Sequence, residues 1–302
     1  CCSAGRPKIG HGWPIRRFEV ARSWPATRWP GRLEVIDDDP LVVIDVGHTP
    51  AAIPLVRRIH ASPNFELRRS GFKPDLLLLH YTGLPTVERA IDVLSRSDCK
   101  VSCHYVLGLD GTVTQMVPET QRAWHAGVAF WSGVTDINSC SIGIEIQNVG
   151  HGAGYPDFPE PQMAALEALS QDIVTRHTIA PERVLAHSDV APSRKTDPGE
   201  KLDWRRLHRA GVGHWVAPAG LAAGDAGVGP GEAGPAVTEM QALLARYGYA
   251  IVPTGVVDEQ TRLVVTAFQR HFRPARVDGR IDESSIATLD KLIAALPSSR
   301  VA

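Results

Sequence analysis

The run of four leucines from Leu76 to Leu79 limits the fold of this chain more than any other feature. It is short, it follows Asp75, and it ends on His80. A strand that is apolar on both faces is typical of a sheet covered by helices on both sides. The sequence therefore predicts an α/β fold with this run as a buried strand.

Segments with strand and helix patterns alternate after this run. Asp110-Gly111 is a strong hairpin signal between two of the strand patterns. This order predicts a mixed central β-sheet flanked by helices. The strand patterns are at residues 101–107, 112–117, 141–147 and 183–187, and the helix patterns are at residues 86–97 and 161–177.

Two histidines stand at the ends of apolar strands, His80 and His187, and Asp197 follows in a proline-containing loop. The carboxyl ends of strands are where α/β sheets gather ligands. Two imidazoles and one carboxylate suit a zinc ion with one open position, and Glu145 in the strand pattern at residues 141–147 suits a general base. Core histidines, a polar loop and an exposed strand carboxylate would leave the same residues, so both interpretations stay open here.

Five segments resemble the zinc-dependent N-acetylmuramoyl-L-alanine amidases of the AmpD/AmiD type (amidase type 2). They occur in the family's order between about residues 62 and 215. The resemblance implies the amidase fold shared with peptidoglycan-recognition proteins, and hydrolysis of the amide between the lactyl group of N-acetylmuramic acid and L-alanine. The segments are His80-Tyr-Thr, Val101-Ser-Cys-His-Tyr, Ala123-Trp-His-Ala-Gly, Ser141-Ile-Gly-Ile-Glu-Ile and His187-Ser-Asp-Val-Ala-Pro-Ser-Arg-Lys-Thr-Asp-Pro-Gly.

This resemblance also implies a role for particular residues. His80, His187 and Asp197 would bind Zn²⁺, Glu145 would be the catalytic base, and Lys195 would stabilise the oxyanion. The expected partners are peptidoglycan or muropeptides.

One position departs from the phage-lysozyme branch of the family, because Cys103 precedes His104 where that branch has a tyrosine. Tyrosine-based catalysis is therefore not carried over. We expect Trp124, His125 and His104 to contact substrate. The structural alternatives are a packed loop for Trp124 and His125, and a core histidine for His104.

The C-terminal part is set off by residues 217–235, which are rich in glycine, alanine and proline and predict a flexible linker. Residues 236–296 contain an internal repeat, Gly255-Val-Val-Asp and Gly279-Arg-Ile-Asp, each followed by an amphipathic helix pattern. They resemble a three-helix peptidoglycan-binding domain, and this domain order is that of the AmiD branch. We expect 61–216 to be the amidase domain and each domain to have its own core.

Residues 1–60 are expected to be irregular, with Leu41–Val46 as the only strand-like piece. The net charge of −1 gives no reason to expect nucleic-acid binding, and no apolar run approaches the roughly 18 residues that span a bilayer. A wall-binding domain favours the cell envelope, meaning the periplasm with outer-membrane association as one form. The cytoplasm is the alternative. A lipid anchor at Cys1 is a further hypothesis, and the oligomeric state is open.

Two other functions fit parts of this pattern. A zinc peptidase cutting within the stem peptide would use similar ligands, and its shortened stem products would distinguish it. A peptidoglycan-recognition protein that binds without cutting typically lacks a zinc ligand, whereas this chain has His80, His187 and Asp197.

Overall fold

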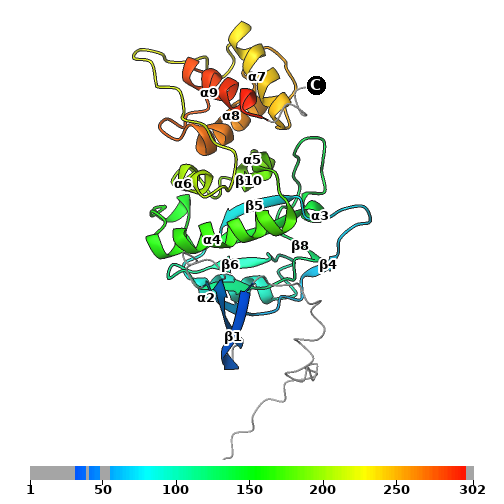
Figure 1. Cartoon of the computed structure of the whole chain (residues 1–302). Coiled ribbons are helices and arrows are strands. Elements are labelled where there is room, and N and C mark those ends of the chain that lie inside the picture. Colours follow the sequence, from blue (N-terminus) through cyan, green and yellow to red (C-terminus); the bar gives the residue numbers. More distant parts are fainter. Residues whose placement is uncertain (1–30, 39–40, 48–54, 297–302) are drawn as a thin grey trace, which may run out of the picture.

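An eight-stranded sheet organises the computed structural model, which describes residues 31–38, 41–47 and 55–296, with side chains from residue 58 onward (Figure 1). Its strand order is β1-β2-β3-β7-β6-β9-β5-β10. The strands are β1 (Gly31–Asp38), β2 (Leu41–Gly47), β3 (Leu55–Ile59), β5 (Leu76–Tyr81), β6 (Tyr105–Leu107), β7 (Val113–Gln115), β9 (Ser141–Ile146) and β10 (Val184–Ala186). Two short strands, β4 (Phe65–Leu67) and β8 (Gln121–Ala123), form a separate antiparallel pair.

The predicted mixed sheet is confirmed, and its register places the candidate residues together. β5 is parallel to both β9 and β10, so all three strands end at the same edge of the sheet. His80 is the direct partner of Glu145 across β5 and β9. His187 follows β10 immediately, because Ala186 is the strand's last residue.

One face of the sheet is covered by α4 (Glu160–His177), as Figure 1 shows. Leu77 and Leu79 of β5 lie in the buried cluster on this face, together with Leu166 and Leu169 of α4. The other helices of this part are α2 (Val87–Ser95), α3 (Ile137–Cys140), α5 (His187–Val190) and α6 (Trp204–Arg209), and single 3₁₀ turns span His151–Ala153 and Pro181–Arg183.

The N-terminal region contains more regular structure than we expected. The strand-like piece is present as β2, but β1 and β3 are strands as well. β3 is antiparallel to β2 and parallel to β7, so the sheet supplies its backbone partners. Its sequence, with two adjacent arginines, has no apolar alternation that could have announced a strand. Cys1 lies outside the described residues.

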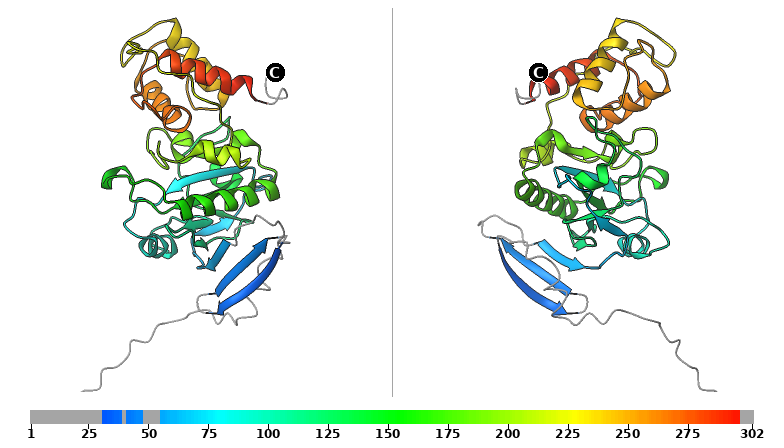
Figure 2. Two further views of the ribbon diagram at one scale, coloured as in Figure 1. Left: turned by 60° about the vertical axis from the view of Figure 1, so that its left-hand side comes forward. Right: turned by 90° about the vertical axis from the view of Figure 1, so that its right-hand side faces the viewer.

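The C-terminal residues 235–296, called the helical unit below, form three helices as predicted. These are α7 (Pro235–Tyr247), α8 (Glu259–Phe272) and α9 (Glu283–Ala294). The side chains of Asp258 and Asp282 cap α8 and α9, accepting hydrogen bonds from the third residue of each helix. The helical unit and the β1–β2 pair lie at opposite ends of the molecule (Figure 2). Within the described ranges, no helix is both long and apolar enough to cross a membrane.

The segment between the two parts differs from the flexible linker that we expected. Val228 and Ile281 pair as a β-bridge, as do Ala233 and Val256, and Ser284 Oγ donates a hydrogen bond to the carbonyl of Ala219 (2.7 Å). The cores are not separate either, because one continuous buried cluster contains both Leu78 of β5 and residues of the helical unit.

Candidate metal centre

Three side chains converge at the carboxyl edge of β5 and β10. His80 Nδ1 lies 2.8 Å from His187 Nδ1 and 3.3 Å from Asp197 Oδ2, and His187 Nδ1 lies 3.0 Å from Asp197 Oδ2. Ligand atoms around a tetrahedral zinc, with bonds of about 2.0–2.2 Å, are separated by roughly 3.3–3.6 Å. The three predicted ligands are thus brought together, and all are buried.

The other ring nitrogen of His187 indicates which of its nitrogens carries the proton. His187 Nε2 lies 3.1 Å from the carbonyl oxygen of Ala126, which can only accept a hydrogen bond. Nε2 must therefore be protonated in the neutral ring. The lone pair of Nδ1 then points toward His80 and Asp197, as a metal ligand requires.

His80 is oriented by a chain of polar groups behind it. His80 Nε2 lies 3.0 Å from His125 Nδ1, and His125 Nε2 lies 3.2 Å from Ser141 Oγ. Ser141 Oγ donates to the carbonyl of Ile137 (2.6 Å), which fixes the direction of the chain. With each group donating to the next, Nδ1 of His80 is left as the unprotonated nitrogen facing the site.

The electrostatic surroundings favour the protonation states that bind metal. Burial, together with the neighbouring His187, lowers the pKa of His80 to about 4, against the opposing effect of Asp197. Burial alone would raise the pKa of Asp197, but the contacts with His187 and His80 lower it overall. Two neutral imidazoles and an ionised carboxylate are the forms that coordinate zinc, so these residues fit the ion.

Glu145 lies beside this group on β9. Its Oε2 is buried and has no hydrogen-bond partner among the described residues. Burial, and then the charge of Asp197, raise the pKa of Glu145 well above its ordinary value, whereas the charge of Lys195 lowers it. A carboxylate with a raised pKa and a free oxygen is suited to accept a proton at neutral pH.

Comparison with known proteins identifies the family and the fold. A family model described as N-acetylmuramoyl-L-alanine amidase matches residues 70–200, and one described as a peptidoglycan binding domain matches residues 233–289. The chain is 37% identical over 230 residues to the N-acetylmuramoyl-L-alanine amidase AmiD of Escherichia coli, covering 72% of this chain and 82% of AmiD. This chain belongs to the N-acetylmuramoyl-L-alanine amidase family.

Two further matches, one to a solved structure of the same AmiD and one to another protein, delimit the likeness. A solved structure of E. coli AmiD, in complex with anhydro-N-acetylmuramic acid-L-Ala-D-γ-Glu-L-Lys, matches with a TM-score of 0.64 and 34% identity. It covers 75% of this chain and 91% of that chain. The 1,6-anhydro-N-acetylmuramyl-L-alanine amidase AmpD of Enterobacter cloacae is 34% identical over 164 residues, which is 49% of this chain and 86% of AmpD. The AmiD matches therefore extend over much more of this amidase than the AmpD match does.

The three residues expected to contact substrate differ in their burial and in their partners. His104 is fully buried, with Nδ1 accepting from the backbone N–H of Gly143 (3.0 Å) and Nε2 facing Arg68 and Gln121. His125 is 6% exposed and lies behind His80. Both ring nitrogens of each histidine face other protein groups, which argues against substrate contact. Trp124 is half-buried, so a place in the cleft remains a prediction for it.

Gly143 lacks a side chain for a steric reason. A Cβ atom on Gly143 would lie 2.5 Å from His125 Nδ1, so the His125 ring fills that space. The glycine thus makes room for the group that orients His80.

Three residues that support this amidase site were not predicted from the sequence. Ser141 ends the chain behind His80. Arg194 donates to the carbonyl of Ala126, the same oxygen that His187 faces (2.9 Å). Asp189 is buried two residues after His187. The signal available for Arg194 and Asp189 was their position inside the segment from His187 to Asp197, called the ligand segment below.

Proposed function

We propose that this chain is a zinc-dependent amidase that hydrolyses the bond between the lactyl group of N-acetylmuramic acid and L-alanine in peptidoglycan or muropeptides. The observation that carries the proposal is the convergence of His80, His187 and Asp197, with the unpartnered carboxylate oxygen of Glu145 beside them. Each of the three would hold zinc through the atom that faces the other two.

Zinc, when bound, supplies a Lewis acid that polarises the amide carbonyl and makes water more acidic. Glu145 takes a proton from the attacking water and returns it to the nitrogen of the leaving L-alanine. Lys195 stabilises the negative charge that develops on the carbonyl oxygen. Its charge lowers the pKa of both Glu145 and His80, which supports a place for Lys195 next to the reacting groups.

The two family matches support a division of labour along the chain. Residues 61–216 form the amidase part, residues 217–235 connect it, and residues 236–296 bind the wall polymer. Trp124, from the half-buried loop after β8, stacks on a sugar or stem-peptide group of the substrate.

We place the protein in the cell envelope, where peptidoglycan lies. The wall-binding part and the relatives that bind muropeptides support this location. Outer-membrane association through a lipid on Cys1 stays a prediction.

Three variants test the proposal with metal content and product release as readouts. Asp197→Ala removes a ligand and should lose both zinc and activity. Glu145→Gln keeps its volume but cannot accept the proton, so zinc should stay near one per chain while turnover falls by about 10²–10⁴. Lys195→Met should also keep zinc and reduce kcat more than KM.

The soluble test substrate is anhydro-N-acetylmuramic acid-L-Ala-D-γ-Glu-L-Lys, and the expected product is the free peptide with L-alanine at its N-terminus. Asp157→Ala, at an aspartate whose side chain is 87% exposed, is the control for losing a carboxylate elsewhere. A Glu145→Gln protein without zinc would make Glu145 a ligand. Shortened stems would indicate a stem peptidase, and binding without any product would indicate a recognition protein.

A further inference from the structure

Asp189 joins the ligand segment to the helical unit. Its side chain is 1% exposed and accepts three hydrogen bonds. One comes from within the amidase part, from the backbone N–H of Ala186 to Oδ2 (2.8 Å). The other two come from the helical unit: Tyr249 O–H donates to Oδ1 (2.6 Å) and His271 Nδ1 donates to Oδ2 (2.7 Å). A buried carboxylate with these donors is strongly fixed in place.

The position of Asp189 is coupled to two of the candidate zinc ligands. It is the third residue of α5, the four-residue helix that begins with His187. Through Ala186 it ties the start of α5 to the end of β10. The backbone N–H of Ser188, in the same helix, donates to the carbonyl of Asp197 (3.0 Å). A displacement of α5 would therefore move His187 and Asp197 together.

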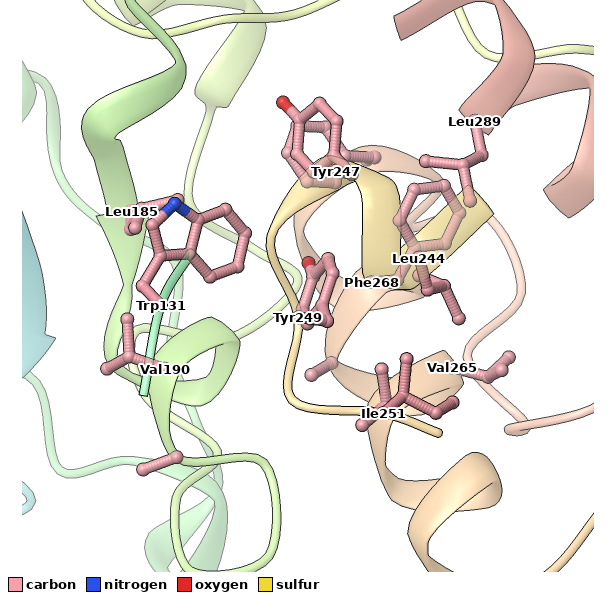
Figure 3. Close-up of a cluster of buried hydrophobic side chains, with 14 of the residues drawn as sticks. Trp131, Leu185, Val190, Leu244, Tyr247, Tyr249, Ile251, Val265, Phe268 and Leu289 are labelled. Carbon is pink, nitrogen blue, oxygen red and sulfur yellow. The ribbon is translucent and has the colours of Figure 1, made fainter. Parts of the chain in front are cut away.

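Aromatic rings from the amidase part and from the helical unit pack around the contact at Asp189. Trp131 packs edge-to-face against Tyr249, with ring centroids 4.9 Å apart (Figure 3). The His271 ring is stacked between Trp204 of α6 and its own neighbour Phe272, each 3.7 Å away. Burial, and then the charge of Asp189, raise the pKa of Tyr249 well above its ordinary value, so its hydroxyl remains a donor. Water does not compete for these hydrogen bonds, which strengthens them.

We propose that Tyr249 and His271 are positioning residues for the metal centre: through Asp189, the helical unit holds His187 and Asp197 in the arrangement that binds zinc. This inference rests on the proposed function, because it concerns the same zinc site. It assigns the wall-binding part a second role, as a structural component of the catalytic centre.

Two tyrosines in the same interface provide a matched test in the full-length protein. Tyr249→Phe removes one hydrogen bond to Asp189. Tyr247→Phe removes a hydroxyl that pairs with His214 Nδ1 (2.8 Å), away from the ligand segment. Zinc dissociation constants would be measured by competition with a chelator, and thermal midpoints in saturating zinc would compare the loss of stability.

We expect Tyr249→Phe to weaken zinc binding by about 10-fold, the lower end of the effect seen for groups that orient metal ligands. Tyr247→Phe should leave the zinc dissociation constant unchanged. It should lower the thermal midpoint by about as much as Tyr249→Phe does. Asp189→Asn should weaken zinc binding more than Tyr249→Phe, because an amide NH₂ at this place would face a donor instead of accepting from it.

Equal zinc constants for wild type, Tyr249→Phe and Asp189→Asn would overturn the inference and leave the interface with a stabilising role only. The inference would also be overturned if Tyr247→Phe weakened zinc binding as much as Tyr249→Phe. Failure of the proposed function would look different, because the wild-type protein itself would then bind no zinc.

Discussion

The two faces of β5 are covered in different ways, although both are lined by leucines of the same strand. On one face Leu77 and Leu79 pack under α4, which follows β9 in the chain after a single 3₁₀ turn. On the other face Leu76 and Leu78 belong to a cluster that continues through Trp131 and reaches the helical unit beyond β10. One face is therefore closed locally, and the other depends on residues far along the chain.

This difference bears on the metal centre, because His80 extends from the same strand. The ligand atoms lie at the carboxyl edge of the sheet. A disturbance of the helical unit can thus reach the site through the second face, whereas α4 acts only on the first. We call α4 the first cover and the helical unit the second cover of β5. The following predictions test the two covers separately, beginning with the largest effect.

Removal of residues 217–302 should have the largest effect, because it removes the helical unit, which is the second cover. Trp131, Leu185 and Val190, each at most 2% exposed, would meet water, and Asp189 would lose two donors. Exposing a large apolar side chain costs about 1.5–3 kcal/mol, against a typical total stability of about 5–15 kcal/mol. We expect an aggregated or poorly folded product, measured by size-exclusion chromatography and near-UV circular dichroism.

A protease site placed after Gly224 in the full-length protein is the control for this truncation. Cutting there severs the chain but removes no residue of either piece, so the two pieces should elute together with zinc bound. A truncated protein that stays monomeric and folded, with the zinc affinity of the full-length chain, would contradict the importance of the second cover.

A matched pair on β5 compares the covers with a smaller disturbance. Leu77→Ala and Leu78→Ala remove the same atoms from adjacent, fully buried positions on opposite faces. Each should cost about 2–5 kcal/mol, the range for leucine truncation in a core. Leu77→Ala should raise hydrogen exchange in α4, whereas Leu78→Ala should raise it in the helical unit. The comparison fails if both variants loosen the same helix.

Local pattern was enough to predict the elements of each cover. The leucine run, the helical spacing of residues 161–177 and the aspartate caps of α8 and α9 correspond to β5, α4 and the two capped helices. The three candidate ligands were also predictable, because each lies at a strand end or in the loop after it. The residue type that can bind metal and the strand end that positions it could therefore both be recognised within a short stretch of sequence.

The contact between the parts had no such local signal. Asp189 is 60 residues from Tyr249 and 82 from His271, and each looks like an ordinary polar or aromatic residue in its own segment. Residues 217–235 have the composition of a flexible linker, yet hydrogen bonds to the helical unit hold them. Composition predicts how flexible a segment is in isolation. Tertiary contacts can order the same segment in the folded protein.

The smallest predicted effect is a pH dependence that arises from a contact of α4. Glu119 is buried and accepts hydrogen bonds from Arg176 of α4 (2.6 and 2.8 Å) and from Tyr105 (2.7 Å). Burial alone would raise the pKa of Glu119, but the hydrogen bonds from Arg176 and His177 lower it overall. A carboxyl group with a lowered folded-state pKa stabilises the protein above the ordinary glutamate pKa and loses that contribution as pH falls below it.

The free energy of unfolding should therefore decrease by up to about 1.4 kcal/mol per pH unit once the pH drops below roughly 4.3, from this group alone. Glu119→Gln cannot titrate, so it should be less stable at pH 7 but show a shallower decline between pH 4 and 3. Glu167→Gln, on α4 itself, is the control at a more exposed pair with Arg206 and should keep the wild-type slope. Hydrogen exchange at pH 3.5 should rise in α4 before it rises in the helical unit. The opposite order would mean that the α4 cover is the more durable of the two in acid, and the assignment of the acid-sensitive contact to Glu119 would be wrong.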